Sequence, residues 1–172
     1  DKNLNIRFYA EPNLPYQLVG DPLRIYQVLL NICSNAIKFS QNGCITIKIT
    51  HKKIQDNQKM TLYAEVIDSG IGMTDEQLLK IFSPFTQADG STNRKYGGTG
   101  LGLSIVKQLV DLMDGKLSAS SQLHKGSTFT VELPLSYVNS SHTILAAPNI
   151  DRGKLYYFKK GPKGLVTDDY FE

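Results

Sequence analysis

The sequence predicts an α+β fold of two layers, in which a mixed and mostly antiparallel sheet carries three helices on one face. Two observations predict it. Segments with strand alternation follow one another through short polar turns, as in hairpins, and three segments with helical periodicity lie between them. The 172 residues, of which 41% are hydrophobic, suffice for one ordinary core. We therefore expect one compact domain over residues 1–136, followed by a linker and tail of unknown role over residues 137–172.

The first half of the chain supplies one long helix. Asp21 followed by Pro22 predicts its start, because aspartate caps helix N-termini and proline is accepted at the first helical position. The helical periodicity continues to Phe39, and apolar residues cover more than half of the circumference, so we expect this helix to be covered on most sides. The apolar surface is widened by Leu30, Cys33 and Ile37. Alternation predicts strands at residues 6–10, 45–50 and 60–66.

The second half supplies two further helices. Thr74 with Gln77 three residues later has the capping-box pattern, which predicts a short helix over residues 75–82. Another helix is expected over residues 101–113, ended by Gly115 as a glycine C-cap. Alternation and turn residues predict strands at residues 116–121 and 128–135, and an aromatic hairpin around residues 161–164.

Composition excludes several classes of function. The net charge of +3 is not gathered into a basic stripe, so we expect no nucleic-acid partner and no direct membrane contact. Two cysteines suit a reducing compartment rather than a disulfide scaffold. We expect a cytoplasmic location, and the abrupt start of the chain suggests a piece of a longer parent, whose membrane anchoring is left open.

A narrow polar stripe on the first helix allows two interpretations. Asn31, Asn35 and Lys38 stand at positions i, i+4 and i+7 and share one side of the helix. The stripe is either the solvated face or the wall of a nucleotide pocket. Asparagine is a weak helix former, whereas its oxygen can join the coordination of Mg²⁺, and a nearby lysine can pair with phosphate.

Two glycine-bearing segments are further candidates. In IDSGIGM, Asp68 is either part of a plain turn or an acceptor for an exocyclic amine, with Gly70 and Gly72 allowing the backbone to run under a flat ring. The segment GTGLG, from Gly98 to Gly102, opens a helix after a loop of residues 84–100 that is nearly free of aliphatic side chains. It matches neither a dinucleotide fingerprint nor a P-loop.

These segments occur in a specific order. N-x-x-x-N-A-x-K-F, D-x-G-x-G, F-x-P-F, G-G-T-G-L-G-L and G-S-T-F follow one another at residues 31, 68, 82, 97 and 126. In that order they resemble the catalytic and ATP-binding domain of sensor histidine kinases, within the ATPase superfamily shared with gyrase, the Hsp90 chaperones and the MutL repair proteins. The resemblance covers residues 5–135 and implies a Bergerat-type ATP-binding fold with ATP and Mg²⁺ as ligands.

The resemblance also implies residue roles. Asp68 would accept the adenine amine, helped through water by Thr128, with Gly72 beneath the ring. Asn35 would ligate Mg²⁺, with Asn31 nearby, and Lys38 would reach the phosphates. The phosphates would meet backbone N–H groups of Gly98, Thr99, Gly100, Leu101 and Gly102. The lid would place Arg94 at the terminal phosphate and Tyr96 against the adenine or ribose, above a base formed by Phe82 and Phe85.

The resemblance implies a protein histidine kinase rather than a hydrolysing enzyme. Hydrolysing members carry a glutamate where this chain has Asn31, and an amide cannot accept a proton from water. None of His51, His124 and His142 has the helical, acid-flanked setting of a phospho-acceptor, and all three are interpreted as ordinary surface histidines. We therefore expect phosphoryl transfer to a histidine on a separate dimerisation domain, a response regulator downstream, and inactivity of this chain alone.

Two alternatives stay open. The first is a non-enzymatic, nucleotide-dependent interaction module, in which the lid changes shape with the bound nucleotide. The second is a hydrolysing conformational ATPase, which Asn31 disfavours.

Overall fold

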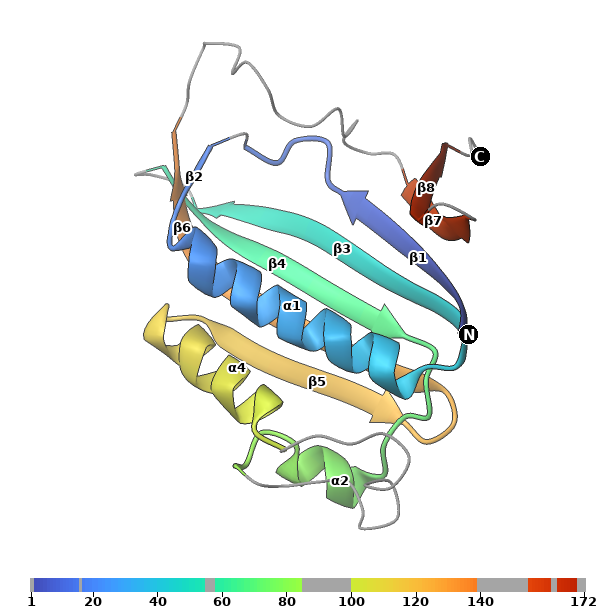
Figure 1. Ribbon diagram of the computed structural model, residues 1–172. Helices are drawn as coiled ribbons and strands as arrows, with labels where there is room; N and C mark the ends of the chain where they lie inside the picture. Colours follow the sequence, from blue (N-terminus) through green and yellow to red (C-terminus); the bar gives the residue numbers. More distant parts are fainter. Residues whose placement is uncertain are drawn as a thin grey trace.

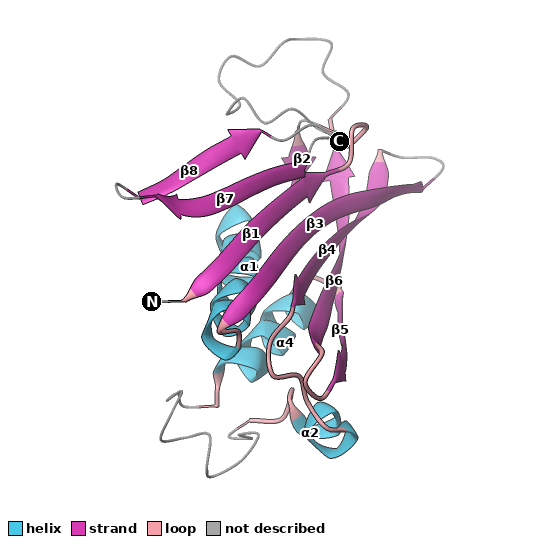
Figure 2. Cartoon of the chain, turned by 90° about the vertical axis from the view of Figure 1, so that its right-hand side faces the viewer, coloured by secondary structure: helices cyan, strands magenta, loops and turns pink. Residues whose placement is uncertain are grey.

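The computed structural model describes residues 2–15, 17–54, 58–84, 100–138, 155–161 and 164–169. It consists of a single mixed sheet with helices on one face, as predicted (Figures 1 and 2). Two of the described helices, α1 (Pro22–Phe39) and α4 (Gly102–Leu112), lie side by side across the sheet. The third, α2 (Asp75–Lys80), lies beside the end of β5 (Lys116–Gln122).

The sheet joins strands that are far apart in the sequence. Its order is β2-β6-β4-β3-β1-β7-β8, with β5 paired to β6. The pair of β1 with β3 is parallel, and every other pair is antiparallel. Besides β5, the strands are β1 (Asn3–Ala10), β2 (Leu18–Val19), β3 (Asn42–Ile54), β4 (Lys59–Asp68), β6 (Gly126–Tyr137), β7 (Leu155–Gly161) and β8 (Gly164–Asp169).

The local signals for the helices are confirmed. The Asp21 side chain accepts a hydrogen bond from the Arg24 N–H at 3.1 Å, and Pro22 occupies the first turn of α1. Thr74 and Gln77 form both bonds of the capping box at the start of α2. Such caps satisfy N–H groups that have no partner inside the helix, which is why short sequence patterns locate these helix ends.

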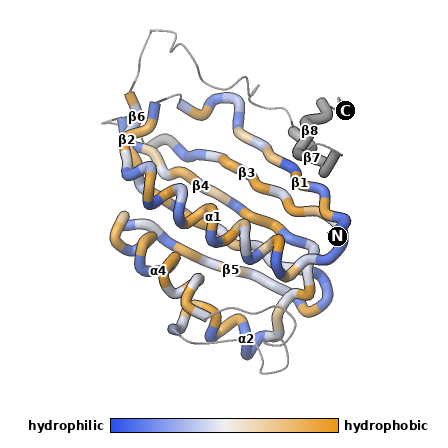
Figure 3. Tube along the Cα trace, viewed as in Figure 1, coloured by the Kyte–Doolittle hydropathy of each residue, from blue (hydrophilic) through white to orange (hydrophobic). Residues whose placement is uncertain are grey.

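The core lies between the sheet and the helices. On β4 every second residue is buried, from Met60 to Val66, and these side chains pack against Val28, Ile32 and Ala36 of α1. Figure 3 shows that both β4 and α1 carry hydrophobic residues along their length. The same alternation brings Asp68 onto the helix-facing side of the sheet.

The prediction that α1 is covered on most sides is wrong. Its outer face carries exposed apolar side chains, with Leu23 at 72% and Tyr26 at 61% of full exposure, followed by Leu30 and Ile37. The sheet covers one side of α1 and α4 covers an adjacent side. A wide apolar surface in the sequence of a helix therefore does not imply that the helix is covered on every side.

The role predicted for Gly115 as a C-cap is also wrong. Asp114 adopts the left-handed conformation after α4, with φ of 55°. Gly115 is needed for close packing, because a Cβ there would lie 2.6 Å from the Glu132 carbonyl oxygen and 2.8 Å from a Leu133 methyl group. The close approach of the β6 backbone therefore leaves no room for a side chain at position 115.

The tail contains the predicted hairpin. Strands β7 and β8 pair in antiparallel fashion with Gly161 opposite Gly164, and β7 also pairs with β1, Ile6 lying opposite Phe158. The sheet thus continues beyond residue 136, although the division of the chain into two parts at this point remains a prediction.

Candidate functional site

Asp68 ends β4 as a buried acceptor. The residue is 7% exposed, and its Oδ1 atom accepts the N–H of Gly70 at 2.8 Å. Burial raises the pKa of the Asp68 carboxyl group above its ordinary value, while hydrogen bonds from the Gly70 and Ser127 N–H groups act in the opposite direction. A buried carboxylate held by backbone donors is suited to accept a further donor from a ligand.

The glycines that follow Asp68 are packed against protein. A Cβ on Gly70 would lie 2.6 Å from the Phe39 carbonyl oxygen and 2.9 Å from Ser40 Oγ. Gly72 has φ of 64°, and a Cβ there would lie 2.0 Å from the Gln122 carbonyl oxygen. Both glycines therefore have a steric role in this loop, and their contact with a flat ring remains a prediction.

The register of the sheet places Ser127, rather than Thr128, opposite Asp68. Ser127 is directly opposite Asp68, whereas Thr128 is opposite Ile67, whose side chain is on the other face. Sequence reasoning missed Ser127. The signal was available in the sequence, because apolar residues alternate from Phe129 to Leu135 and so predict that the odd-numbered positions of this strand share the helix-facing side, as their burial shows.

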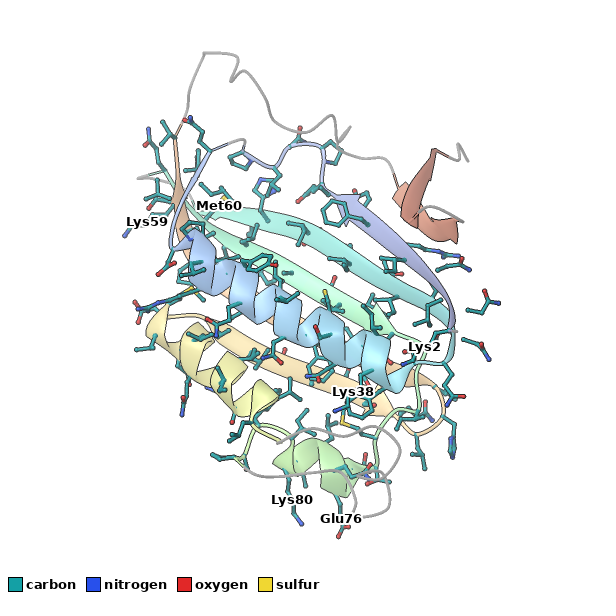
Figure 4. The ribbon with its side chains drawn as sticks, in the orientation of Figure 1. Lys2, Lys38, Lys59, Met60, Glu76 and Lys80 are labelled. Carbon is teal, nitrogen blue, oxygen red and sulfur yellow. The ribbon has the colours of Figure 1, made fainter. Side chains whose placement is uncertain are left out.

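The polar stripe of α1 is not its most solvated side. Asn31, Asn35 and Lys38 are each half-buried, while the exposed face carries Leu23 and Tyr26. The Lys38 ammonium lies 5.0 Å from the centre of the Phe39 ring, and Figure 4 shows Lys38 with Lys2 at the C-terminal end of α1. The stripe is therefore not simply the solvated face of α1, and its role as the wall of a nucleotide pocket remains a prediction.

The start of α4 meets this stripe. A Cβ on Gly102 would lie 2.7 Å from Asn31 Oδ1, so the first residue of α4 is in close contact with the middle of α1. The N-cap residue is Leu101, which makes no capping bond, and Gly100 before it has φ of 71°. Aspartate and threonine cap α1 and α2, so α4 differs from them in offering its first N–H groups without a side-chain acceptor.

Several predicted residues lie outside the described part of the chain. They are Phe85, Arg94, Tyr96, Gly98 and Thr99. Phe82, at the base of the predicted lid, is half-buried and packs against the core. Among the described residues, no group of three or more His, Cys, Asp or Glu side chains could hold a metal ion, so a cation here would depend on neutral oxygen atoms such as that of Asn35.

Neither histidine in the described part of the chain lies on a helix, where a phospho-acceptor was expected. His51 is half-buried, with a side chain only 7% exposed and its Nδ1 atom 2.8 Å from Glu11 Oε2, which corrects its interpretation as an ordinary surface residue. His124 is exposed in the β5–β6 turn with φ of 63°, and His142 lies outside the described residues. The pairing of β1 with β3, which sequence patterns did not reveal, brings Glu11 next to His51 just beyond the last paired residues.

Comparison with known proteins places these features in a family. The model of the family described as "Histidine kinase-, DNA gyrase B-, and HSP90-like ATPase" matches residues 20–137. The chain belongs to this ATPase family. The matched part runs from just before α1 to the end of β6, and so contains Asp68, the α1 stripe and the start of α4.

Relatives of this ATPase-family chain include sensor kinases. It is 38% identical to the signal transduction histidine-protein kinase BarA of Shigella flexneri over 87% of its own length and 16% of that protein. It is 39% identical to the sensor histidine kinase RcsC of Escherichia coli (strain K12) over 95% of its length and 15% of that protein. The chain thus spans less than one fifth of the length of these relatives.

Solved structures agree with the fold. Full-length ShkA in complex with AMPPNP shares 28% identity with a TM-score of 0.63, over 80% of this chain and 27% of that one. The catalytic domain of the histidine kinase ThkA shares 32% identity with a TM-score of 0.52, over 75% of this chain and 78% of that one. Within the described residues, no helix is both long and apolar enough to span a membrane.

Proposed function

We propose that the chain is the ATP–Mg²⁺-binding catalytic domain of a sensor histidine kinase, which donates the γ-phosphate of ATP to a histidine on a separate dimerisation domain. One observation carries this proposal. Helix α1 contacts the loop beside Asp68 through Phe39 and contacts the start of α4 through Asn31. These two points are eight residues apart, about 12 Å along a helix, so a nucleotide lying along α1 would have its base at Asp68 and its phosphates at α4.

The proposed roles follow from this direction. Asp68 and Ser127 accept hydrogen bonds from the amine of adenine. The sheet register places Ser127 opposite Asp68, so Ser127 is proposed for the role that the resemblance implied for Thr128. The N–H groups at the start of α4, which have no side-chain cap, donate hydrogen bonds to the phosphates. Asn35 is the proposed ligand of Mg²⁺, which when bound would neutralise phosphate charge. Lys38 follows three residues later on α1 and is proposed to pair with the phosphate oxygens.

The reaction is proposed to be phosphoryl transfer with little hydrolysis. Catalysis in such transfers depends mainly on positioning and charge neutralisation. Asn31 of α1 contacts the first residue of α4, and its amide cannot take a proton from an attacking water. Arg94 is proposed to meet the terminal phosphate, and Tyr96 is proposed to meet the base or ribose. A response regulator and a cytoplasmic location belong to the same proposal.

The test separates binding, transfer and hydrolysis. The protein is mixed with ATP and Mg²⁺, alone and with a separately produced dimerisation hairpin of its parent kinase, and free phosphate and acid-labile phosphohistidine are measured. We expect ATP binding in both samples, little free phosphate, and label on the hairpin histidine alone. Asn35→Ala should prevent the transfer. Binding without transfer would instead support a nucleotide-dependent interaction module, and rapid phosphate release without the hairpin would support a hydrolysing ATPase.

A further inference from the structure

Three polar side chains form a row across neighbouring strands at the end of the sheet. Ser127 on β6 is directly opposite Asp68 on β4 and directly opposite Ser121 on β5. Residues opposite each other in antiparallel strands project to the same face, so all three lie on the helix-facing side. Figure 2 shows β4, β6 and β5 side by side where this row is located.

Ser121 makes three hydrogen bonds within this end of the sheet. Its Oγ atom accepts the Met73 N–H at 2.9 Å, lies 2.9 Å from the Gly126 carbonyl oxygen, and lies 3.0 Å from Ser127 Oγ. A hydroxyl group has one proton and two lone pairs. These three contacts therefore use its full hydrogen-bonding capacity.

The direction of each bond can be deduced. The Gly126 carbonyl oxygen only accepts, so the single proton of Ser121 must be donated to it. In the contact between the two serines, Ser127 must then be the donor. The oxygen of Ser127 is left with lone pairs only, beside a carboxylate that already accepts backbone N–H groups from Gly70 and Ser127.

We propose that Ser121 is a specificity-determining residue of the nucleotide site: it orients the Ser127 hydroxyl so that Ser127 faces the base as an acceptor only. The inference rests on the proposed function, since it requires a purine at Asp68. Two acceptors side by side select a purine with an exocyclic amine over one with a carbonyl group at that position. A carbonyl there would place a third acceptor against the Ser127 oxygen and the Asp68 carboxylate, and neither would receive a hydrogen bond from that group.

The same contacts position the walls of the site. The bond from the Met73 N–H ties the loop after Asp68 to β5, and the His124 N–H reaches the Ile71 carbonyl oxygen at 2.7 Å. A purely structural role of Ser121 would therefore affect every nucleotide equally. The proposed role makes a different prediction, because it concerns discrimination between two bases.

The test compares affinities for ATP–Mg²⁺ and ITP–Mg²⁺, whose base carries a carbonyl group where adenine carries the amine. Binding is measured by calorimetry on the full chain and on Ser121→Ala, Ser121→Thr and Ser120→Ala. Ser120 is the matched control, since it is the exposed neighbour on the opposite face of β5. We expect Ser121→Ala to reduce the preference for ATP over ITP by roughly three- to tenfold, the range that one hydrogen bond supports. Ser121→Thr and Ser120→Ala should keep the preference of the unmodified protein.

An equal loss of both affinities in Ser121→Ala, or the same change in Ser120→Ala, would overturn the proposal. If Ser121→Ala does not fold, Ser127→Ala decides, because it leaves the Met73 and Gly126 bonds of Ser121 intact. An unchanged preference in Ser127→Ala would also overturn it. An unmodified protein that binds neither nucleotide would refute the proposed function itself, which is a separate result.

Discussion

Asn31 in the middle of α1 lies against Gly102, the first residue of α4, so closely that a Cβ on the glycine would stand 2.7 Å from Asn31 Oδ1. The contact joins the helix that carries the polar stripe to the helix whose N-terminus has no side-chain cap. It also gives Gly102 a role beyond leaving room for phosphates, because the Asn31 amide occupies the space where a side chain would begin.

Gly102→Ala is expected to weaken nucleotide binding without unfolding the protein. The added methyl group displaces the end of the Asn31 side chain, while alanine is favoured over glycine in a helix by up to about 1 kcal/mol. We expect an unchanged or higher melting temperature and a loss of ATP–Mg²⁺ affinity of about tenfold, equivalent to one bond with a charged group. The control is Ile105→Ala, which shortens an exposed side chain of the same helix. Equal affinities in Gly102→Ala and Ile105→Ala would contradict the prediction.

Asp68→Asn is expected to abolish measurable ATP binding in a folded protein. The amide oxygen can still accept the Gly70 N–H, so the loop is kept, but the amide nitrogen would present a donor where the ligand requires an acceptor. An unpaired polar group at this site costs about 1–3 kcal/mol. Calorimetry that shows wild-type affinity in a folded Asp68→Asn protein would remove Asp68 from the site.

The stability of the nucleotide-free protein should depend on Asp68 in a defined pH window. Because burial raises the pKa of Asp68 above the ordinary value of 3.8, its contribution favours the folded state at low pH and is lost as pH rises through the folded pKa. We therefore expect Asp68→Asn to be more stable than the unmodified protein at pH 7. The difference should shrink as pH falls toward 3.8, as measured by urea unfolding at several pH values.

Glu11 should show the opposite dependence. The N–H of His51 and, to a smaller extent, its ring lower the pKa of the Glu11 carboxyl group below 4.5, so its contribution is present above that value and is lost as pH falls through the folded pKa. Glu11→Gln should be less stable than the unmodified protein at pH 6 to about 7, and the difference should vanish in acid. A constant difference across the range would show that packing, rather than charge, is responsible.

Two buried serines provide a matched comparison. Ser40 Oγ is fully buried and has no hydrogen-bond partner among the described residues, whereas Ser104 Oγ donates to the Leu101 carbonyl oxygen at 2.9 Å. Ser40→Ala should leave the free energy of unfolding unchanged or raise it, because an unsatisfied hydroxyl is removed. Ser104→Ala should lower it by about 1 kcal/mol. Chemical denaturation of both variants measures the two effects, and a larger loss in Ser40→Ala would contradict this interpretation of the Ser40 hydroxyl.

Local chemistry allowed part of this structure to be predicted from the sequence. Asp21 with Pro22 fixed the start of α1, and Thr74 with Gln77 fixed the start of α2, because a cap acts within one helical turn. The order of the motifs was also enough to indicate the family, which the match over residues 20–137 confirms. Each cap and each single motif lies within a few consecutive residues.

Other features depend on which segments meet, and only the tertiary structure decides them. The pairing of β1 with β3 brings Glu11 within hydrogen-bond distance of His51, and the close approach of β6 explains why residue 115 is a glycine. The outer face of α1 is exposed because one sheet and one helix cover only part of its surface. Register also decides which residue is opposite Asp68: a shift of one residue along a strand turns a side chain to the other face, and the register places Ser127 rather than Thr128 opposite Asp68.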